Sequence, residues 1–429
     1  MDFWEILEKT QEYISGHYAG VLSNDVDNLQ LKAYIKKFIR DSGYQAENND
    51  IDGLVERINC EMTEYSVITP YLGSDEVEEI NINGWDDVAV TYRSGKIEKL
   101  KRHFRSPEHA TDIVKRLLHH SGMIIDNATP LSMGHLPGNA RITALKTPIV
   151  DPDRGVAVSI RILHPYEVKK DRLISGGFAA CEMIDFLCAC VRYGVPFVIA
   201  GATSSGKTTL LNAILDTIPE NKRIFTIESG ARELSLLKRS ERDAAVVNNV
   251  VHTLSRPSES PAGDITQEQL VVASLRFNPD VICVGEMRDV ECYAAVEASL
   301  TGHTVVSTVH SGPAGLTHTR IALLCQKRFP IKFEISLIQA AQAFPVVVYT
   351  HKLENNERKI MDISECIVNG DGERQYNCLY SYIIDCSFKV DGKAVIQGHF
   401  VKQNPPSEEL KNRLIRNGLP TEELKKFEV

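Results

Sequence analysis

The chain has 429 residues, of which 43% are hydrophobic and 24% charged, and its formal net charge is −9. This length exceeds what one hydrophobic core ordinarily holds, so we expect two or three globular domains. No apolar run approaches the roughly 20 residues of a membrane span, and the net charge argues against a general nucleic-acid coat and against unaided attraction to anionic lipid.

The first 163 residues divide into two textures. Residues 1–60 show helical periodicity, which predicts a helical extension. Over residues 61–163 short strand-like runs appear, and DVAVTYRSGKIEKL is typical of a hairpin that turns at Ser94–Gly95. The stretch SPEHATDIVKRLLHHSG predicts a helix capped by Ser106, and RITALKTPIV and VAVSIRIL predict two paired strands. We expect a compact α+β domain here.

The rest of the chain alternates strands and helices. Residues 164–177 mix Pro, Gly and charge, which is typical of an interdomain linker. From residue 178, the runs VPFVIAG, RIFTIES, DVICVGE and TVVSTVHS predict an α/β domain with a mostly parallel sheet that extends to residue 429. Strand-like pieces and a helix, SEELKNRLIRNG, form its expected C-terminal appendage. The ten cysteines include no C-x-x-C pair, so a zinc site is poorly supported.

The stretch GATSSGKTTL, residues 201–210, fills the pattern G-x-x-x-x-G-K-[ST]. An apolar run precedes it and a helical pattern follows, which is the strand–loop–helix context that a phosphate-binding loop requires. Backbone N–H groups and the helix N-terminus attract phosphate, the lysine reaches the β- and γ-phosphates, and the threonine hydroxyl ligates Mg²⁺. We assign ATP and Mg²⁺ to this loop, with nucleotide contacts from Gly201, Thr203, Ser204, Ser205, Gly206, Lys207, Thr208 and Thr209.

A second strand supplies a carboxylate. DVICVGEMRD runs from four apolar residues into Gly285–Glu286, where many P-loop enzymes have an aspartate at the position of Gly285. Glu286 is therefore expected to orient or deprotonate the attacking water, and to contact through water the Mg²⁺ that the Thr208 hydroxyl ligates. The alternative is a surface acid that follows a core strand.

Other polar residues at strand ends leave alternatives open. Glu228 ends RIFTIES and either reaches the γ-phosphate side or is a solvated loop acid. His303 and His310 flank a further strand, where a histidine can sense the γ-phosphate, although a lone histidine is more often structural. Arg141 and Arg161 lie in the paired strands of the earlier domain; an inserted guanidinium stabilises phosphoryl transfer, but the residues alone favour surface salt bridges.

Four motifs in order, GATSSGKTT, TIESGAREL, DVICVGEMRD and TGHTVVSTVHSG, resemble those of the ATPases of type II and type IV secretion and pilus assembly. In that family they are the Walker A loop, the acidic box, the Walker B strand with Gly-Glu, and the histidine box. The resemblance covers roughly residues 65–420 and is greatest to the Tad/Flp pilus ATPase subgroup. It implies a RecA-like P-loop domain, ATP bound between two domains, and a homo-oligomeric ring, usually a hexamer.

The resemblance also implies roles for particular residues. Arg141 and Arg161 become the preferred stabilisers of γ-phosphate charge, and Glu228 becomes the catalytic carboxylate of the acidic box. His310, with His303 beside it, belongs to the histidine box. A further nucleotide contact, Arg288, matches the family's Gly-Glu-x-Arg. The implied partner is a polytopic inner-membrane platform protein, served by a cytoplasmic ATPase that has no membrane span of its own.

The chain departs from the family pattern at several positions. Ser204 stands where the family commonly has glycine, so either the loop is altered or Ser204 keeps an ordinary φ. Ser229 stands where the acidic box usually has aspartate. These departures leave nucleotide binding intact and put the efficiency of hydrolysis in question.

The sequence is compatible with three functions. The leading one is a ring ATPase that drives pilus assembly or secretion. A nucleotide-switched scaffold with little hydrolysis is the second, supported by Ser229 and by the SGP that follows His310 in place of the family's usual Ala-containing segment. A DNA translocase is the third, and the net charge of −9 and the lack of a basic, aromatic-interleaved stretch count against it and against any nucleic-acid partner.

Overall fold

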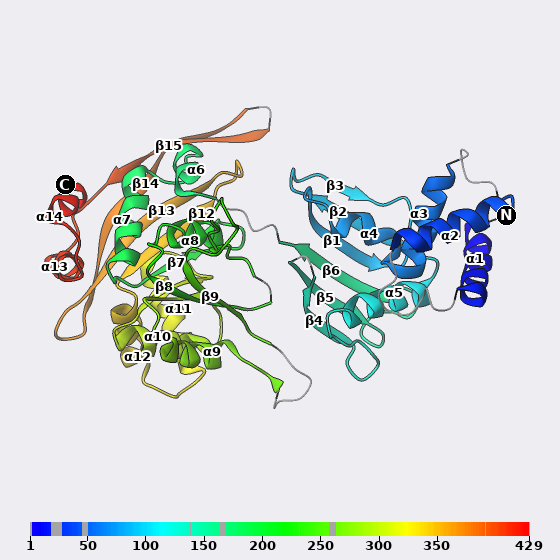
Figure 1. Cartoon of the computed structure of the whole chain (residues 1–429). Helices are drawn as coiled ribbons and strands as arrows, with labels where there is room; N and C mark the ends of the chain where they lie inside the picture. The colour runs from blue at the N-terminus through cyan, green and yellow to red at the C-terminus, as the bar shows by residue number, and fades with distance from the viewer. Residues whose placement is uncertain are drawn as a thin grey trace. The chain divides into compact units, whose positions relative to one another are not determined.

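The computed structural model divides into two compact units, Met1–His164 and Pro165–Val429, called here the first and second units (Figure 1). The described residues are 2–18, 28–44, 50–137, 139–163, 168–230, 232–256, 263–390 and 392–428. Part of the predicted linker, residues 164–167, lies outside them. The rest of that linker includes helix α6, Lys170–Ser175, whose Leu173 is buried in the core of the second unit.

Three helices begin the first unit, as the sequence predicts: α1 (Phe3–His17), α2 (Asn28–Asp41) and α3 (Ile51–Thr63). A capping box formed by Asp2 and Glu5 starts α1. Apolar residues at helical spacing bring the three helices around a small core of their own, made of Ile6, Leu7, Ile14, Leu31, Ile35, Ile39, Val55 and Ile58.

An antiparallel six-stranded sheet forms the body of the first unit, in the order β3-β2-β1-β6-β5-β4. Its strands are β1 (Val77–Gly84), β2 (Asp87–Tyr92), β3 (Ile97–Lys99), β4 (Leu131–Leu136), β5 (Ala140–Lys146) and β6 (Val156–Ile162). One face carries the apolar residues that pack on α5 (Pro107–His119). The short helices η3 (Ser66–Ile68) and α4 (Thr69–Leu72) precede β1. The predicted cap at Ser106 and the hairpin at Ser94–Gly95 are both confirmed.

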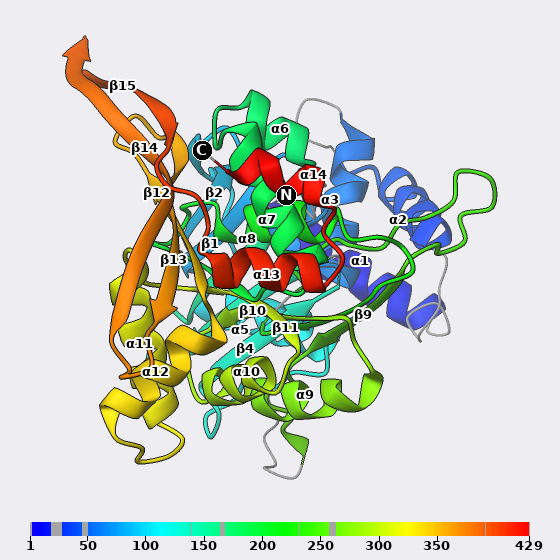
Figure 2. The ribbon, with the colours of Figure 1, turned by 90° about the vertical axis from the view of Figure 1, so that its left-hand side faces the viewer.

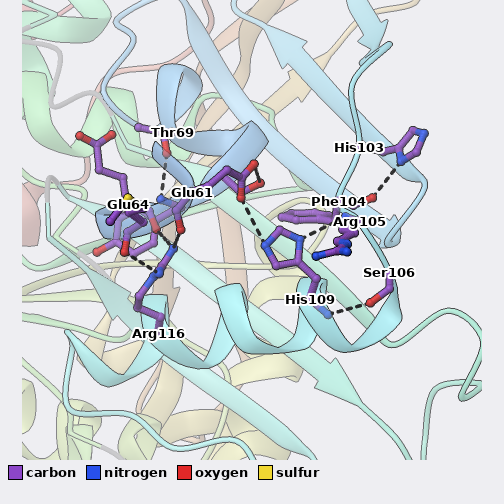
Figure 3. A network of polar contacts seen from close by, with 12 residues as sticks. Glu61, Glu64, Thr69, His103, Phe104, Arg105, Ser106, His109 and Arg116 are labelled. Carbon is purple, nitrogen blue, oxygen red and sulfur yellow. Dashed lines mark hydrogen bonds and ion pairs between the residues drawn. The ribbon is translucent and has the colours of Figure 1, made fainter. Parts of the chain in front are cut away.

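A partly buried polar network joins α3 to α5 (Figure 3). Arg116 of α5 donates to the backbone carbonyl oxygens of Glu61, at 3.3 Å, and of Glu64. The Glu61 carboxylate accepts a 2.7 Å hydrogen bond from the Ser66 hydroxyl and lies 3.3 Å from Nε2 of His109. The end of α3, whose carbonyls lack helical partners, is therefore held by side chains of neighbouring elements.

A nine-stranded sheet runs through the second unit in the order β15-β14-β13-β12-β7-β11-β10-β8-β9. Its strands are β7 (Phe197–Gly201), β8 (Arg223–Glu228), β9 (Asn249–Leu254), β10 (Val281–Met287), β11 (Thr304–Val309), β12 (Val346–Lys352), β13 (Arg358–Val368), β14 (Arg374–Val390) and β15 (Lys393–Lys402). The six strands from β12 to β9 are parallel, and β13 to β15 continue the sheet antiparallel. In Figure 2 the ends of β14 and β15 project from the unit as a two-stranded ribbon.

Helices cover both faces of this sheet, and each face has its own apolar core. One face carries α6, α7 (Cys181–Arg192), α8 (Lys207–Leu215), α13 (Glu408–Arg416), α14 (Thr421–Leu424) and η6 (Lys425–Phe427). The other carries α9 (Gln267–Ser274), η5 (Leu275–Phe277), α10 (Glu291–Leu300), α11 (Ala314–Gln326) and α12 (Phe333–Ala343). Strands β7 and β11 are buried along their whole length, as expected for parallel strands between two helical layers.

The predicted fold class is thus confirmed: helices, then an α+β sheet, then an α/β unit with a mostly parallel sheet. In the part of the chain that the structure describes, no helix combines the length and the apolarity needed to cross a membrane.

Candidate nucleotide site

The phosphate loop joins β7 to α8, and two of its positions admit only glycine. A Cβ atom on Gly201 would lie 2.4 Å from the Thr350 carbonyl oxygen and 2.5 Å from Oγ of Ser205. Gly206 has φ +95° at the N-cap of α8, and a Cβ there would lie 2.8 Å from the Phe178 ring. The loop therefore packs tightly against Thr350 of β12 and against the Phe178 ring, so neither position has room for a side chain.

Lys207 begins α8, and its side chain turns back into the loop. The residue is buried, and Nζ donates to the carbonyl oxygens of Gly201 at 3.0 Å and Ala202 at 2.8 Å. Desolvation lowers the pKa of Lys207, while the Glu286 carboxylate opposes that shift. Thr208 follows half-buried and Thr209 exposed in the first helical turn. This is the cationic centre of the loop.

The exposed part of the loop contains Thr203 and Ser204. Ser204 has φ +58°, in the left-handed region that favours glycine, so the alternative of an ordinary φ is wrong. Ser205 is fully buried, and its hydroxyl lies 2.9 Å from the hydroxyl of Thr350. The chain thus keeps the backbone shape of a glycine at a serine position.

The carboxyl ends of β10 and β11 bring two predicted residues to the loop. His310 lies with Nε2 3.0 Å from Oε1 of Glu286 and Nδ1 3.4 Å from Nζ of Lys207. Burial, followed by the charge of Lys207, lowers the pKa of His310, which favours the neutral ring. With Nδ1 accepting from the lysine, Nε2–H donates to Glu286. Arg288 is nearby, with Nε 3.7 Å from Oε2 of Glu286.

Glu228 lies at the carboxyl end of β8 with only 4% of its surface exposed, so the alternative of a solvated loop acid is wrong. Oε1 accepts from the backbone N–H groups of Glu233 at 2.7 Å and Leu234 at 3.0 Å. Among the described residues Oε2 has no hydrogen-bond partner, and desolvation raises the pKa of Glu228 to about 7.

Gly285 lies directly against this acid. A Cβ at Gly285 would lie 3.3 Å from Cγ of Glu228, so a larger side chain at this position would crowd the buried carboxyl group. Many P-loop enzymes have an aspartate at this position. Here the glycine leaves room for the buried Glu228 side chain.

His303 lies away from these residues. It stands at the amino end of β11, where Nδ1 is 3.2 Å from the Ala298 carbonyl oxygen, whereas the phosphate loop meets the carboxyl end of that strand. The structure thus brings His310 to the loop and leaves His303 at the opposite edge of the sheet.

Arg141 and Arg161 belong to the first unit. They are directly opposed residues of β5 and β6, so their side chains share one face of that sheet. Arg161 is half-exposed, and its guanidinium lies 4.0 Å from Glu78. A role for this pair at the nucleotide stays a prediction.

Sequence reasoning missed the residues that support the loop from β12 and β13. Thr350 packs under it, and Arg358 donates a hydrogen bond from Nε to the Ser204 carbonyl oxygen at 2.7 Å. They follow the loop by roughly 150 residues along the chain and carry no motif, so only the order of strands in the sheet reveals them.

A strand, a phosphate loop with a buried lysine and a carboxylate on a neighbouring strand end together define a P-loop nucleotide-binding protein of the α/β class. Within that class, the chain belongs to the family described as Type II/IV secretion system protein, whose model matches residues 61–375.

Three individual relatives share between 19% and 32% sequence identity with the chain over the regions that match. An uncharacterized protein of Methanocaldococcus jannaschii is 32% identical over 242 residues, which are 56% of this chain and 41% of that protein. Type IV secretion system protein PtlH of Bordetella pertussis is 29% identical over 263 residues, 54% of this chain and 74% of PtlH. The solved structure of the Legionella pneumophila ATPase DotB has 19% sequence identity and a TM-score of 0.46, with 82% of each chain covered. The chain thus spans less than half of the first of these relatives.

Proposed function

We propose that this chain binds Mg-ATP at the phosphate loop and hydrolyses it. The observation that carries the proposal is the continuous set of contacts Lys207–His310–Glu286 at the carboxyl edge of the sheet, with Nζ to Nδ1 at 3.4 Å and Nε2 to Oε1 at 3.0 Å. In this proposal Lys207 meets the β- and γ-phosphates, and Glu286 orients or deprotonates the attacking water.

The oxygen-bearing side chains at the loop are suitable ligands for Mg²⁺. The ion prefers oxygen ligands and is usually held by one or two side chains, with phosphates and water completing the shell. The Thr208 hydroxyl and the Glu286 carboxylate are donors of that kind, and both lie at the loop edge of the sheet. Bound there, Mg²⁺ would neutralise charge on the phosphates.

His310 positions the proposed base. Its neutral ring donates from Nε2 to Oε1 of Glu286, which holds the carboxylate in one orientation. Oε2, which lies 3.7 Å from Nε of Arg288, then accepts a hydrogen bond from the attacking water. Arg141, Arg161 and Arg288 are proposed to stabilise charge on the phosphates, and Glu228 to act as a second carboxylate on the γ-phosphate side. Residues 61–163 and 178–429 are proposed to work as two domains joined by the 164–177 linker.

The cellular role is a secretion or pilus-assembly motor. Support comes from family membership and from relatives such as PtlH, which is named as a type IV secretion system protein. We place the chain in the cytoplasm as a homo-oligomeric ring, a hexamer of the Tad/Flp pilus subgroup, that acts on a polytopic platform protein in the inner membrane.

Substitution of Lys207 tests the loop assignment. Lys207→Ala should abolish ATP binding, measured by calorimetry on the full chain, because it removes the cation that the loop holds for phosphate. Lys222→Ala removes an exposed lysine of the same unit, paired with Asp280, and should bind normally. Wild-type affinity in Lys207→Ala would contradict the proposal.

A further inference from the structure

The phosphate loop is tied to a strand far away in the chain. Arg358, the first residue of β13, donates from Nε to the carbonyl oxygen of Ser204 at 2.7 Å, across a sequence separation of 154 residues. A guanidinium donor and a short distance make this a charge-assisted hydrogen bond. It acts on the backbone of the loop at one defined peptide group.

That peptide group is the strained one. Ser204 has φ +58°, a conformation in which the Cβ of an L-residue crowds the following carbonyl. A glycine would adopt it freely. Serine persists there only when neighbouring contacts fix the backbone, and the Arg358 hydrogen bond is such a contact.

The start of β13 is itself firmly held. Arg358 pairs with Lys352 of β12. The next residue, Lys359, is buried and donates to the Gly177 carbonyl oxygen at 2.7 Å. The N–H of Ile360 donates to the Phe178 carbonyl oxygen at 2.9 Å. Arg358 thus extends from a fixed backbone to the loop.

Phe178 closes the arrangement. A Cβ atom on Gly206 would lie 2.8 Å from the Phe178 ring and 3.5 Å from Cδ of Arg358. Arg358 and the Phe178 ring therefore both pack against the loop near Gly206. The backbone of Phe178 is itself hydrogen-bonded to β13, the strand that carries Arg358.

We propose that Arg358 is a positioning residue for nucleotide binding, which fixes Ser204 in the left-handed conformation so that the loop keeps its phosphate-binding shape. This inference rests on the proposed function of the loop. It explains how the chain tolerates serine where its family commonly has glycine.

A double-mutant cycle tests the inference. Arg358→Ala should weaken ATP and ADP binding alike by about tenfold, the order expected for loss of a hydrogen bond from a charged donor. It should raise KM and leave kcat unchanged, because the contact is the same in the ground and transition states. In a Ser204→Gly background the same change should weaken binding by less than about twofold, since glycine needs no support there.

Two controls accompany the cycle. Arg358→Lys keeps a charged donor and should bind ATP within about threefold of the wild type. Arg416→Ala removes an exposed arginine from α13 and should change nothing. The thermal unfolding midpoint of the nucleotide-free proteins gives an independent readout, in which Arg358→Ala should lower the midpoint more in the serine background than in the glycine background.

The results of these experiments distinguish failure of the positioning role of Arg358 from failure of the proposed ATP binding. Equal losses of affinity in both backgrounds, or a fall in kcat, would overturn the positioning role and favour direct contact with phosphate. A wild-type chain that binds no ATP would overturn the proposed function. In that case the thermal unfolding midpoints of the nucleotide-free proteins would still test whether Arg358 supports Ser204. Equal shifts of the midpoint in the serine and glycine backgrounds would contradict that support.

Discussion

Glu228 ends β8 with its carboxyl group buried beside Gly285, and its protonation should be visible in the stability of the protein. Burial raises the pKa of Glu228 from the ordinary 4.5 to about 7. The folded protein therefore holds more protons than the unfolded chain between these two values, and the free energy of unfolding should fall as pH rises through that window.

Glu228→Gln should remove this fall, because the amide is neutral at every pH. Relative to the wild type, the variant should gain roughly 3 kcal/mol of stability between pH 4 and pH 8. Urea unfolding at these two pH values measures it, with the exposed Glu220→Gln as control. Parallel pH profiles of variant and wild type would show that Glu228 titrates normally.

Glu286 is the acid on which hydrolysis should depend. Glu286→Gln keeps the shape of the side chain and an oxygen that can accept from Nε2 of His310, but it loses the base. Mg-ATP should bind nearly as tightly as to the wild type, while kcat should fall by about 10²-fold or more. If steady-state turnover stays within a few-fold of the wild type, Glu228 becomes the better candidate for the base.

At the scale of elements, the network between α3 and α5 should carry much of the stability of the first unit. Arg116→Ala would leave the backbone carbonyl groups of Glu61 and Glu64 at the end of α3 without this donor. We expect a loss of about 2–4 kcal/mol in the free energy of unfolding, measured by urea titration. Arg102→Ala, at an exposed position, is the control; equal values for both variants would assign the network no weight.

The elements also show what sequence patterns can and cannot predict. The α5 helix and the β2–β3 hairpin follow from local signals, a serine cap and a Ser-Gly turn, and both form as predicted. Strand β9 lies in a segment without a family motif; it is an edge strand and only partly buried, so its apolar pattern is weak. Tertiary pairing with β8, which no local signal encodes, makes it a strand.

The same reasoning applies to the site. Lys207, Glu286 and His310 could be predicted to meet because the carboxyl ends of parallel strands lie along one edge of a sheet, and each residue lies at or after the carboxyl end of such a strand. Arg358 could not, because its contact depends on β12 and β13 following β7 in the sheet. Burial of Glu228 depends likewise on the backbone at Glu233 and Leu234 turning back over it.

For the whole molecule, the proposed motor requires arginines of the first unit to act in hydrolysis. Arg161→Ala should lower kcat more than it raises the Kd for ATP, because the proposed contact of its guanidinium with the phosphoryl oxygens should strengthen as charge develops there. Arg141→Ala should behave alike. Since the two residues oppose one another across β5 and β6, the double variant should lose less than the sum of the single losses.

Steady-state kinetics and equilibrium binding of the three variants measure these effects, with Arg102→Ala as a first-unit control. Full kcat in Arg161→Ala would remove this arginine from the mechanism. ATP binding without turnover in the wild type would favour a nucleotide-switched scaffold.

The most direct test of the central claim is the specific ATPase activity of the full chain measured across a range of protein concentrations. A ring-forming ATPase should hydrolyse Mg-ATP with a specific activity that rises with concentration as subunits assemble, because assembly follows mass action. Lys207→Ala should show no activity at any concentration. Hydrolysis that is absent from the wild type, or whose specific activity is the same at every concentration, would contradict this account.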